Sequence, residues 1–171
     1  MQYEILYALT GYVETGNAQM VLKSSAVGSC VVVVVYDVKL ITGGMAHIML
    51  PGKSPDNSIY SKTRFAENAI ASLIHEMEFN GSKHDNLLFC ILGGANVLKR
   101  ENDTISTSNV ESVIKILSSK NYSIVKKSVG GTERRSVTLL VSSGKVVYTI
   151  GNSEEMLFWD FQKQKYEIYE A

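Results

Sequence analysis

Apolar residues along this chain follow two periods, one typical of buried strands and one of amphipathic helices. Residues 31–36, "VVVVVY", form an unbroken β-branched run that predicts a buried strand. "DVKL" predicts a turn, and residues 41–50 predict a second strand paired with the first as a hairpin. Gly43 and Gly44 interrupt that strand and indicate either a bulge or a close backbone approach. Further strands are predicted at residues 19–23 and 86–92, at 122–131 where the strand runs into a turn, and at 135–151 as a hairpin about Ser142-Ser143-Gly144.

Two segments have helical periodicity instead. Residues 62–79 carry one apolar stripe and are followed by Asn80-Gly81, a common helix stop. Residues 108–118 predict a second helix, with Ser108 as N-cap and Glu111 completing a capping box. The stripe of the first helix consists of Phe65, Ala69, Ile70, Leu73, Ile74 and Met77.

Strands mixed with two main helices predict an α+β fold, built as one domain over residues 1–171. The aromatic, amphipathic tail of residues 152–171 has no firm assignment. Lys plus Arg and Asp plus Glu both count 17, so nothing favours binding to nucleic acid or to an anionic membrane. The sequence has no run of 18 apolar residues and no signal-peptide pattern, which predicts a cytoplasmic protein without membrane insertion.

The candidate catalytic residues lie on the two strands of the predicted hairpin, at the end away from the turn. Cys30 follows Gly28-Ser29 and opens the valine strand, while His47 lies on the partner strand. A turn centred near residue 38 or 39 pairs residue 30 roughly with residue 47, which brings the two side chains within cross-strand reach if they share a face. The thiol can then pass its proton to the imidazole and act as a nucleophile. A third group should fix the histidine tautomer, and Ser24 and Ser25 are the nearest hydroxyl groups.

The other reading is that Cys30 is a small buried hydrophobic residue beside five valines. Cys90 fits that description better, because it lies mid-strand with no histidine partner in view. His75 on a helix and His84 in a loop are expected to be solvated or structural. Neither CxxC, HExxH, GxxxxGK nor GxGxxG occurs, so no metal or cofactor is expected.

Taken together, several ordered motifs resemble the chemoreceptor glutamine deamidases of bacterial and archaeal chemotaxis, the CheD family. "VGSCVVVVVYD" resembles that family's L-G-S-C-V-x-V-x-x-Y-D segment, and "GGMAHIMLP" resembles G-G-x-A-H-x-x-L-P with the same spacing between Cys and His. The pieces cover about residues 20–150. The remaining matches are "RFAENAIASLIHEM", "ILGGANVL", "STSNVESV" in place of I-G-x-R-N, and "VGGTERRSV" in place of G-G-x-x-x-R.

The resemblance implies a cysteine hydrolase with a Cys-His-Thr arrangement, in a layered α/β sandwich similar to the catalytic domain of the cytotoxic necrotizing factor toxins. Cys30 is then the nucleophile and His47 the base. The family's threonine lies six or five residues before the cysteine, at Ser24 or Ser25 here. "KSSAVGSC" is closer to the form K-T-S-G-L-G-S-C, which favours Ser24. The chain departs from the family at Ser106-Thr107-Ser108, which replaces G-x-R.

The implied reaction converts glutamines of receptor cytoplasmic helices to glutamates through a thioester on Cys30, releasing ammonia. Methyl-ester hydrolysis at the same positions and transamidation stay open. The resemblance also implies a partner, the CheC type of response-regulator phosphatase. The rival interpretation is a non-catalytic adaptor that binds such a phosphatase or a receptor, and the presence of both Cys30 and His47 favours the enzyme.

Overall fold

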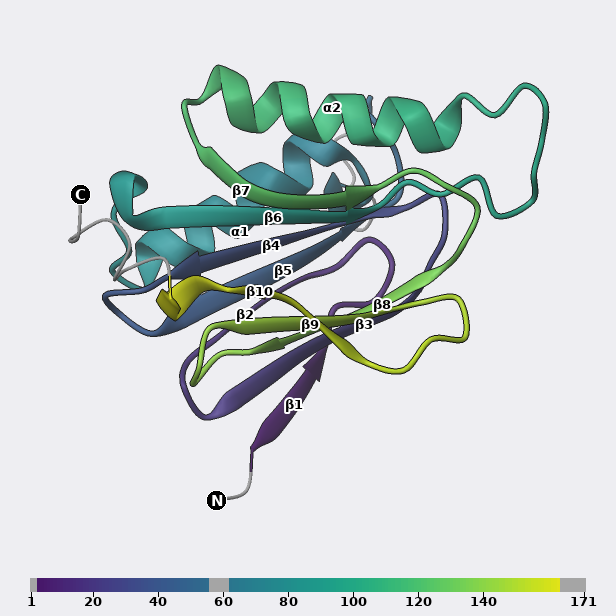
Figure 1. Cartoon of the computed structure of the whole chain (residues 1–171). Coiled ribbons are helices and arrows are strands. Elements are labelled where there is room, and N and C mark those ends of the chain that lie inside the picture. Colours follow the sequence, from purple (N-terminus) through teal and green to yellow (C-terminus); the bar gives the residue numbers. More distant parts are fainter. Residues whose placement is uncertain (1–2, 56–61, 164–171) are drawn as a thin grey trace, which may run out of the picture.

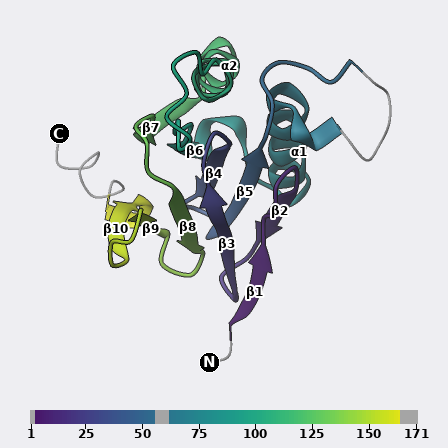
Figure 2. The same cartoon turned by 90° about the vertical axis from the view of Figure 1, so that its right-hand side faces the viewer.

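The molecule has three layers: a pair of helices, a central sheet, and a second sheet packed against the central one. This computed structural model describes residues 3–55 and 62–163 of the chain. Figures 1 and 2 show both helices on one side of the sandwich, with the N-terminal strand at the opposite side. The predicted α+β class, with mixed sheets and two main helices, is confirmed. Within the described ranges, no helix is long and apolar enough to span a membrane.

Among the described residues, each sheet contains five strands and mixes parallel with antiparallel pairs. The helices are α1 (Ala66–Phe79) and α2 (Ile105–Ser119), with two 3-10 turns, η1 (Lys62–Arg64) and η2 (His84–Asn86). The central sheet has the order β2 (Val13–Gly16), β5 (Thr42–Ile48), β4 (Val31–Asp37), β6 (Leu87–Gly93) and β7 (Ser123–Val129). The second sheet has the order β1 (Glu4–Tyr7), β3 (Met20–Val27), β8 (Arg135–Leu140), β9 (Lys145–Ile150) and β10 (Met156–Asp160).

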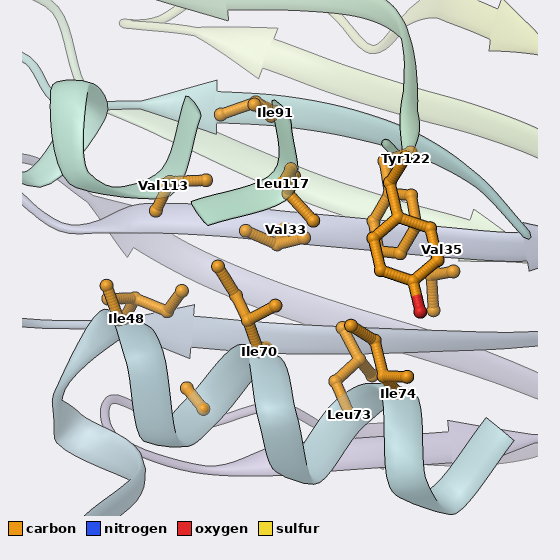
Figure 3. Packing of buried hydrophobic residues seen from close by; sticks show 14 of the residues in the cluster. Val33, Val35, Ile48, Ile70, Leu73, Ile74, Ile91, Val113, Leu117 and Tyr122 are labelled. Carbon is orange, nitrogen blue, oxygen red and sulfur yellow. The ribbon is translucent and has the colours of Figure 1, made fainter. Parts of the chain in front are cut away.

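Strand β4 lies at the centre and is buried along its whole length, because both faces of its sheet are covered. Its odd-numbered residues, such as Val33 and Val35, pack against the helices, as Figure 3 shows with Ile70 and Leu117. Its even-numbered residues belong to the cluster between the two sheets. The same alternation continues in β5, and it decides which way the candidate site residues point.

Gly43 and Gly44 in β5 confirm the expected close approach, and the β4–β5 register runs through them without a bulge. A Cβ on Gly43 would lie 2.6 Å from Leu139 Cδ2 of the second sheet. A Cβ on Gly44 would lie 2.6 Å from Leu73 Cδ1 of α1. The two glycines therefore allow close packing on opposite faces of one strand.

The helix predicted over residues 62–79 begins later, at Ala66, and ends before Asn80 as expected. Phe65 is extended because it forms a β-bridge with Leu50. The carbonyl of Arg64 accepts hydrogen bonds from Met49 and Leu50, each at 2.9 Å. Backbone pairing with the end of β5 thus delays the helix.

The second helix contradicts the predicted N-cap, because α2 begins at Ile105 and places Ser108 inside its first turn. Thr104 occupies the N-cap position without a side-chain capping bond. The Asp103 carboxylate instead accepts from the backbone N–H and the hydroxyl of Ser106. An acidic side chain one turn earlier therefore serves the start of the helix.

The predicted hairpin is confirmed, but the cross-strand partner of Cys30 was wrong. Asp37 pairs with Thr42, which centres the turn between Lys39 and Leu40, and His47 pairs with Val32. The turn has the predicted length of four residues but lies one residue later, and the Asp37 carboxylate supports it by accepting from the backbone N–H groups of Lys39 and Leu40. The other strands were predicted, except β1, β2 and β10. Strand β10 falls in the unassigned tail, whose residues 164–171 lie outside the described part.

Candidate functional site

The loop of residues 28–30, between β3 and β4, carries Cys30 and is held by three successive carbonyl groups. The Gly28 carbonyl accepts from the backbone N–H of Ala95 at 2.8 Å, and the Cys30 carbonyl accepts from that of Gly94 at 2.7 Å. Between them, the Ser29 carbonyl accepts from the side-chain amide of Asn109 at 2.9 Å. Gly93 leaves room for this contact, since a Cβ there would lie 2.3 Å from the Cys30 oxygen. The loop is therefore rigidly placed although it has no regular structure.

His47 lies on β5 and points into the space between the two sheets, where its side chain is 3% exposed. Its Nδ1 lies 2.8 Å from the hydroxyl oxygen of Ser24 on β3. Its backbone is also fixed, because its N–H donates to Tyr12 and its carbonyl accepts from Gly11. The structure thus places Ser24 against the histidine, whereas Ser25 is exposed.

A β-bulge aims Ser24 toward His47. The β3–β8 register shifts between Ser24 and Val27, and Ala26 within the bulge has a φ of 55°. Bulges next to functional sites redirect side chains in this way. The form K-T-S-G-L-G-S-C has glycine at the position of Ala26, which suits the left-handed conformation.

The hydrogen bonds around Ser24 determine the tautomer of His47. The Ser24 hydroxyl donates its only hydrogen to the Ala8 carbonyl at 2.9 Å. It can therefore only accept from the imidazole, so the proton of neutral His47 lies on Nδ1. The lone pair is left on Nε2, which is buried and has no hydrogen-bond partner among the described residues. That nitrogen is available to accept a proton.

Cys30 and His47 share the face of the central sheet that turns toward the second sheet. Cys30 lies one residue before the ladder begins and two before Val32, the direct partner of His47, so the register places both residues at the same end of the β4–β5 pair. The half-buried thiol packs against the cluster between the sheets, which includes Val32. The two-residue error in register therefore keeps Cys30 and His47 at the same end of the hairpin.

Burial sets the charge state of both groups. It raises the pKa of the Cys30 thiol, partly offset by a hydrogen bond from the residue's own backbone N–H. It lowers the pKa of His47, partly offset by a hydrogen bond with the Ala8 backbone. Both shifts favour a neutral thiol beside a neutral imidazole at neutral pH, not a preformed ion pair.

A small cleft lies beside the cysteine loop, with a volume of about 170 Å³. Ser29 forms one wall, and the rest comes from the segment between β6 and α2. Its lining combines apolar side chains with one cation and one anion: Val97, Leu98, Ile105, Arg100 and Asp103.

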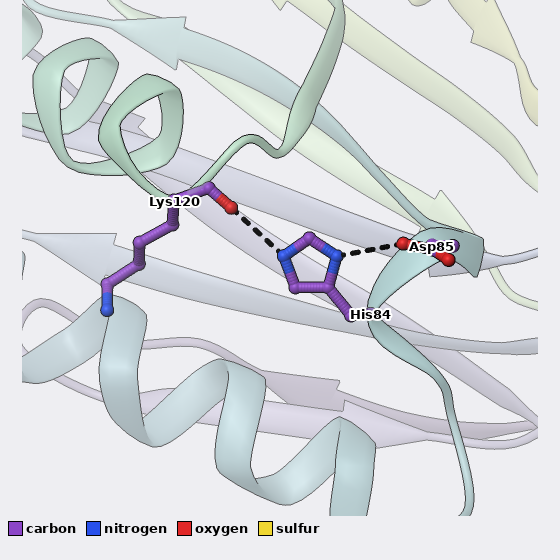
Figure 4. Close-up of polar contacts among 3 residues, drawn as sticks. All are labelled: His84, Asp85 and Lys120. Atoms are coloured by element: carbon purple, nitrogen blue, oxygen red, sulfur yellow. Dashed lines mark hydrogen bonds and ion pairs between the residues drawn. The ribbon is translucent and has the colours of Figure 1, made fainter.

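The remaining cysteine and histidines lie apart from this arrangement. Cys90 is fully buried in the middle of β6, and burial raises the pKa of its thiol far above the ordinary value. His75 is exposed on α1. Figure 4 shows His84 between the Lys120 carbonyl, 2.9 Å away, and the Asp85 carboxylate, 3.2 Å away. Its pKa is raised, first by the bond to Lys120. His84 therefore has a structural role at the end of α2.

Two contributors to the site were missed from the sequence. The Ala8 carbonyl at the end of β1 carries no side-chain signal. Asn109 belongs to the quoted segment "STSNVESV", but its amide reaches the cysteine loop only because α2 packs over that end of the sheet. Within the described ranges, no group of three His, Cys, Asp or Glu residues could hold a metal ion.

A half-buried thiol near a buried imidazole with a free Nε2 and a fixed Nδ1–H has the parts of a cysteine-type hydrolase site. The family model described as CheD chemotactic sensory transduction matches residues 49–149. The chain belongs to the CheD family.

Relatives in that family cover most of the chain. A protein named "Probable chemoreceptor glutamine deamidase CheD" from Chlorobium luteolum is 38% identical over 156 residues, which are 91% of this chain and 78% of the relative. A protein with the same name from Archaeoglobus fulgidus is 31% identical, over 80% of this chain and 87% of the relative. The "Chemoreceptor glutamine deamidase CheD" of Thermotoga maritima is 31% identical, over 80% and 86% respectively.

Proposed function

We propose that this protein is a glutamine deamidase that acts on the cytoplasmic helices of chemoreceptors and so takes part in chemotaxis adaptation. The main structural support is the buried, unpartnered Nε2 of His47, with its Nδ1–H held by Ser24. A purely structural histidine gains nothing from an unpaired buried nitrogen. Membership of the CheD family and the printed names of the relatives support the choice of substrate. Such a substrate places the reaction in the cytoplasm.

In the first half of the reaction, Cys30 attacks the carboxamide carbon of a receptor glutamine. The Sγ–H bond breaks, its proton moves to Nε2 of His47, and the Sγ–C bond forms as the carbonyl becomes an oxyanion. The oxyanion collapses, the C–N bond breaks, and the imidazolium returns the proton to the leaving nitrogen. Ammonia departs and a thioester remains on Cys30.

In the second half, water hydrolyses the thioester. His47 takes a proton from the water as its oxygen attacks the thioester carbon, and the C–S bond then breaks. The proton returns to Cys30 and the glutamate product leaves. The net change is glutamine plus water to glutamate plus ammonia. Ser24 orients the imidazole in both halves and does not touch the reacting atoms.

The test is to incubate the protein with receptor cytoplasmic fragments and to identify modified glutamines by peptide mass spectrometry, with ammonia measured in parallel. We expect conversion at specific glutamines by the wild type and none by Cys30→Ala. Cys90→Ala is the matched control and should retain turnover, at a stability cost of about 1 kcal/mol. Unchanged conversion by Cys30→Ala would remove Cys30 from the mechanism. A methyl ester at the same positions, offered separately, tests ester hydrolysis by the same thiol.

We also propose a CheC-type phosphatase as a binding partner, a proposal based on the family resemblance. Binding is expected to use the surface around the cleft, so Cys30→Ser should bind with wild-type affinity. A fluorescence titration measures this directly. Absence of binding by both wild type and variant would overturn the proposal and would leave the deamidase reaction unaffected.

A further inference from the structure

The side chain of Asn109 bridges the two chain segments that carry the cysteine and the histidine. Its amide nitrogen donates to the Ser29 carbonyl at 2.9 Å and to the Met49 carbonyl at 3.0 Å. Ser29 precedes Cys30 directly, and Met49 lies two residues after His47. Both acceptors are carbonyl oxygens, so only the nitrogen end of the amide can face them.

This bridge lies where strands β4 and β5 separate. Val31 and Ile48 form the last residue pair of their ladder. Beyond that pair, the ladder between the two strands does not continue among the described residues. The amide of Asn109 connects the two backbones there instead. The distance between the nucleophile's segment and the base's segment is therefore set by a side chain of α2.

Asn109 also determines how the peptide between Ser29 and Cys30 is turned. In a trans peptide the carbonyl and the following N–H point in opposite directions. Because the Ser29 carbonyl is held by Asn109, the Cys30 N–H is held on the other side. A fixed N–H at the nucleophile is suitably placed to stabilise an oxyanion.

The energetics of Asn109 indicate more than a contribution to stability. The residue is fully buried, and its Oδ1 has no hydrogen-bond partner among the described residues. A buried amide with an unpaired acceptor is a costly way to hold a helix on a sheet. An apolar residue would pack there without that cost. The bridge to two carbonyls explains why an amide is present.

We propose that Asn109 is a positioning residue, which sets Cys30 relative to His47 by joining the ends of their two segments and orients the Ser29–Cys30 peptide. This rests on the proposed function for its role in turnover. The positioning itself concerns only this chain and is measurable without a receptor.

The experiment measures the rate at which iodoacetamide alkylates Cys30 across a pH series, with peptide mass spectrometry to separate Cys30 from Cys90. We compare Asn109→Ala with Val113→Ala, a buried apolar residue one turn along the same helix, in the cluster between the helices and the central sheet. Both are also made in a His47→Ala background. Asn109→Ala should slow alkylation at neutral pH by about 10- to 100-fold, since small displacements of reacting groups have effects of this size. Val113→Ala should not.

The double-mutant cycle decides the mechanism. If Asn109 acts by placing Cys30 against His47, its effect should largely disappear once His47 is absent. An equal slowing by Asn109→Ala in both backgrounds, or by Val113→Ala, would overturn the proposal. Should Asn109→Ala not fold, Asn109→Ser retains one donor and should give an intermediate rate, whereas a wild-type rate would again overturn it. If the alkylation rates show coupling between Asn109 and His47 but receptor glutamines are not converted, the positioning role stands and the proposed substrate is wrong.

Discussion

The two cysteines of this chain lie in the same layer and have opposite settings. Both side chains pack into the cluster between the sheets, Cys90 as a full member and Cys30 at its margin. Cys90 is in the middle of β6, paired with Val34, and is fully buried. Cys30 lies in a loop just before β4 and is only half-buried. The same residue type therefore fills the core in the middle of β6 and is partly accessible to solvent in the loop before β4.

The direction of the pKa shift does not separate the two thiols, because desolvation raises the pKa of both. The difference lies in their exposure and in their neighbours. Cys30 has its own N–H, a loop held at three carbonyls and a histidine with a free Nε2 on the same face. A reactive cysteine is thus defined by access and by a proton acceptor, even where its pKa is unfavourable.

The largest expected effect is a difference in alkylation between the two cysteines of the native protein. Cys90 can react only when the sheet opens, which global stability makes rare. We therefore expect iodoacetamide to modify Cys90 at least about 100-fold more slowly than Cys30. Peptide mass spectrometry over time measures both rates. In denaturant the two rates should become similar, and equal rates in the native protein would remove the distinction.

The next prediction tests what supports the histidine beside Cys30. Ser24→Ala should lower kcat with little change in KM, since the hydroxyl orients the base and does not hold the substrate. The loss should be smaller than the roughly 100- to 10,000-fold contributed by positioned acid–base catalysis. Ser24→Thr should retain activity, and exposed Ser25→Ala is the matched control. A defect confined to Ser25→Ala would show that Ser25, and not Ser24, orients the histidine.

The pH dependence of kcat/KM should reflect the neutral pair. Protonation of His47 removes the base, and burial lowers its pKa, so the acid limb should have its midpoint below about 6.5. Ionisation of Cys30 removes the proton needed by the leaving ammonia, and its raised pKa places the alkaline limb above about 9.0. Activity should therefore be nearly flat across neutral pH. A midpoint well inside this interval would instead indicate a stabilised thiolate–imidazolium pair.

The smallest expected effect concerns the bulge in β3 that directs Ser24 toward His47. Ala26 adopts a φ of 55°, and an L-residue other than glycine pays roughly 1–2 kcal/mol for the left-handed conformation. Ala26→Gly should raise the free energy of unfolding by about 1 kcal/mol after the entropy of the unfolded chain is counted. Urea unfolding measures this. A lower stability in Ala26→Gly would show that the alanine methyl contributes packing that outweighs the strain.

The parts of the fold that the sequence predicted are those with strong periodicity. In three places the local residue pattern is enough to predict the surroundings: the valine run of β4, the apolar stripe of α1 and the glycine pair in β5. Strands β1, β2 and β10 were missed because they are short and only partly buried, so tertiary pairing and not local pattern determines them. The start of α2 was misplaced because Asp103 and Ser108 both suit a helix start, and only the folded chain decides between them.

The candidate site shows the same limit. Cys30, His47 and Ser24 come from one stretch of chain, so spacing and family motifs identified them together. The register was two residues off because the turn is centred one residue later than predicted, and a shift of two residues keeps each side chain on the same face of the strand. Ala8 could not be found, since a backbone carbonyl has no sequence signature. Asn109 matches the N of the I-G-x-R-N segment, but its contact with the cysteine loop, 79 residues away, depends on packing that the sequence does not show. Their catalytic roles, like those of Cys30, His47 and Ser24, stay predictions.

The cleft beside the cysteine has a consequence for how such a protein can diversify. The proposed reacting groups and the serine that orients the base lie within residues 24–47, whereas most of the cleft wall comes from residues 95–105. The first stretch is locked into two sheets, and the second is a connection outside the ladders. We therefore expect substitutions at exposed Leu98 or at Arg100 to alter which receptor helices are converted and to leave the proposed chemistry at Cys30 intact. Residues 96–102 are therefore the segment to exchange between relatives in a test of receptor recognition, since Ala95 holds the cysteine loop and Asp103 the start of α2.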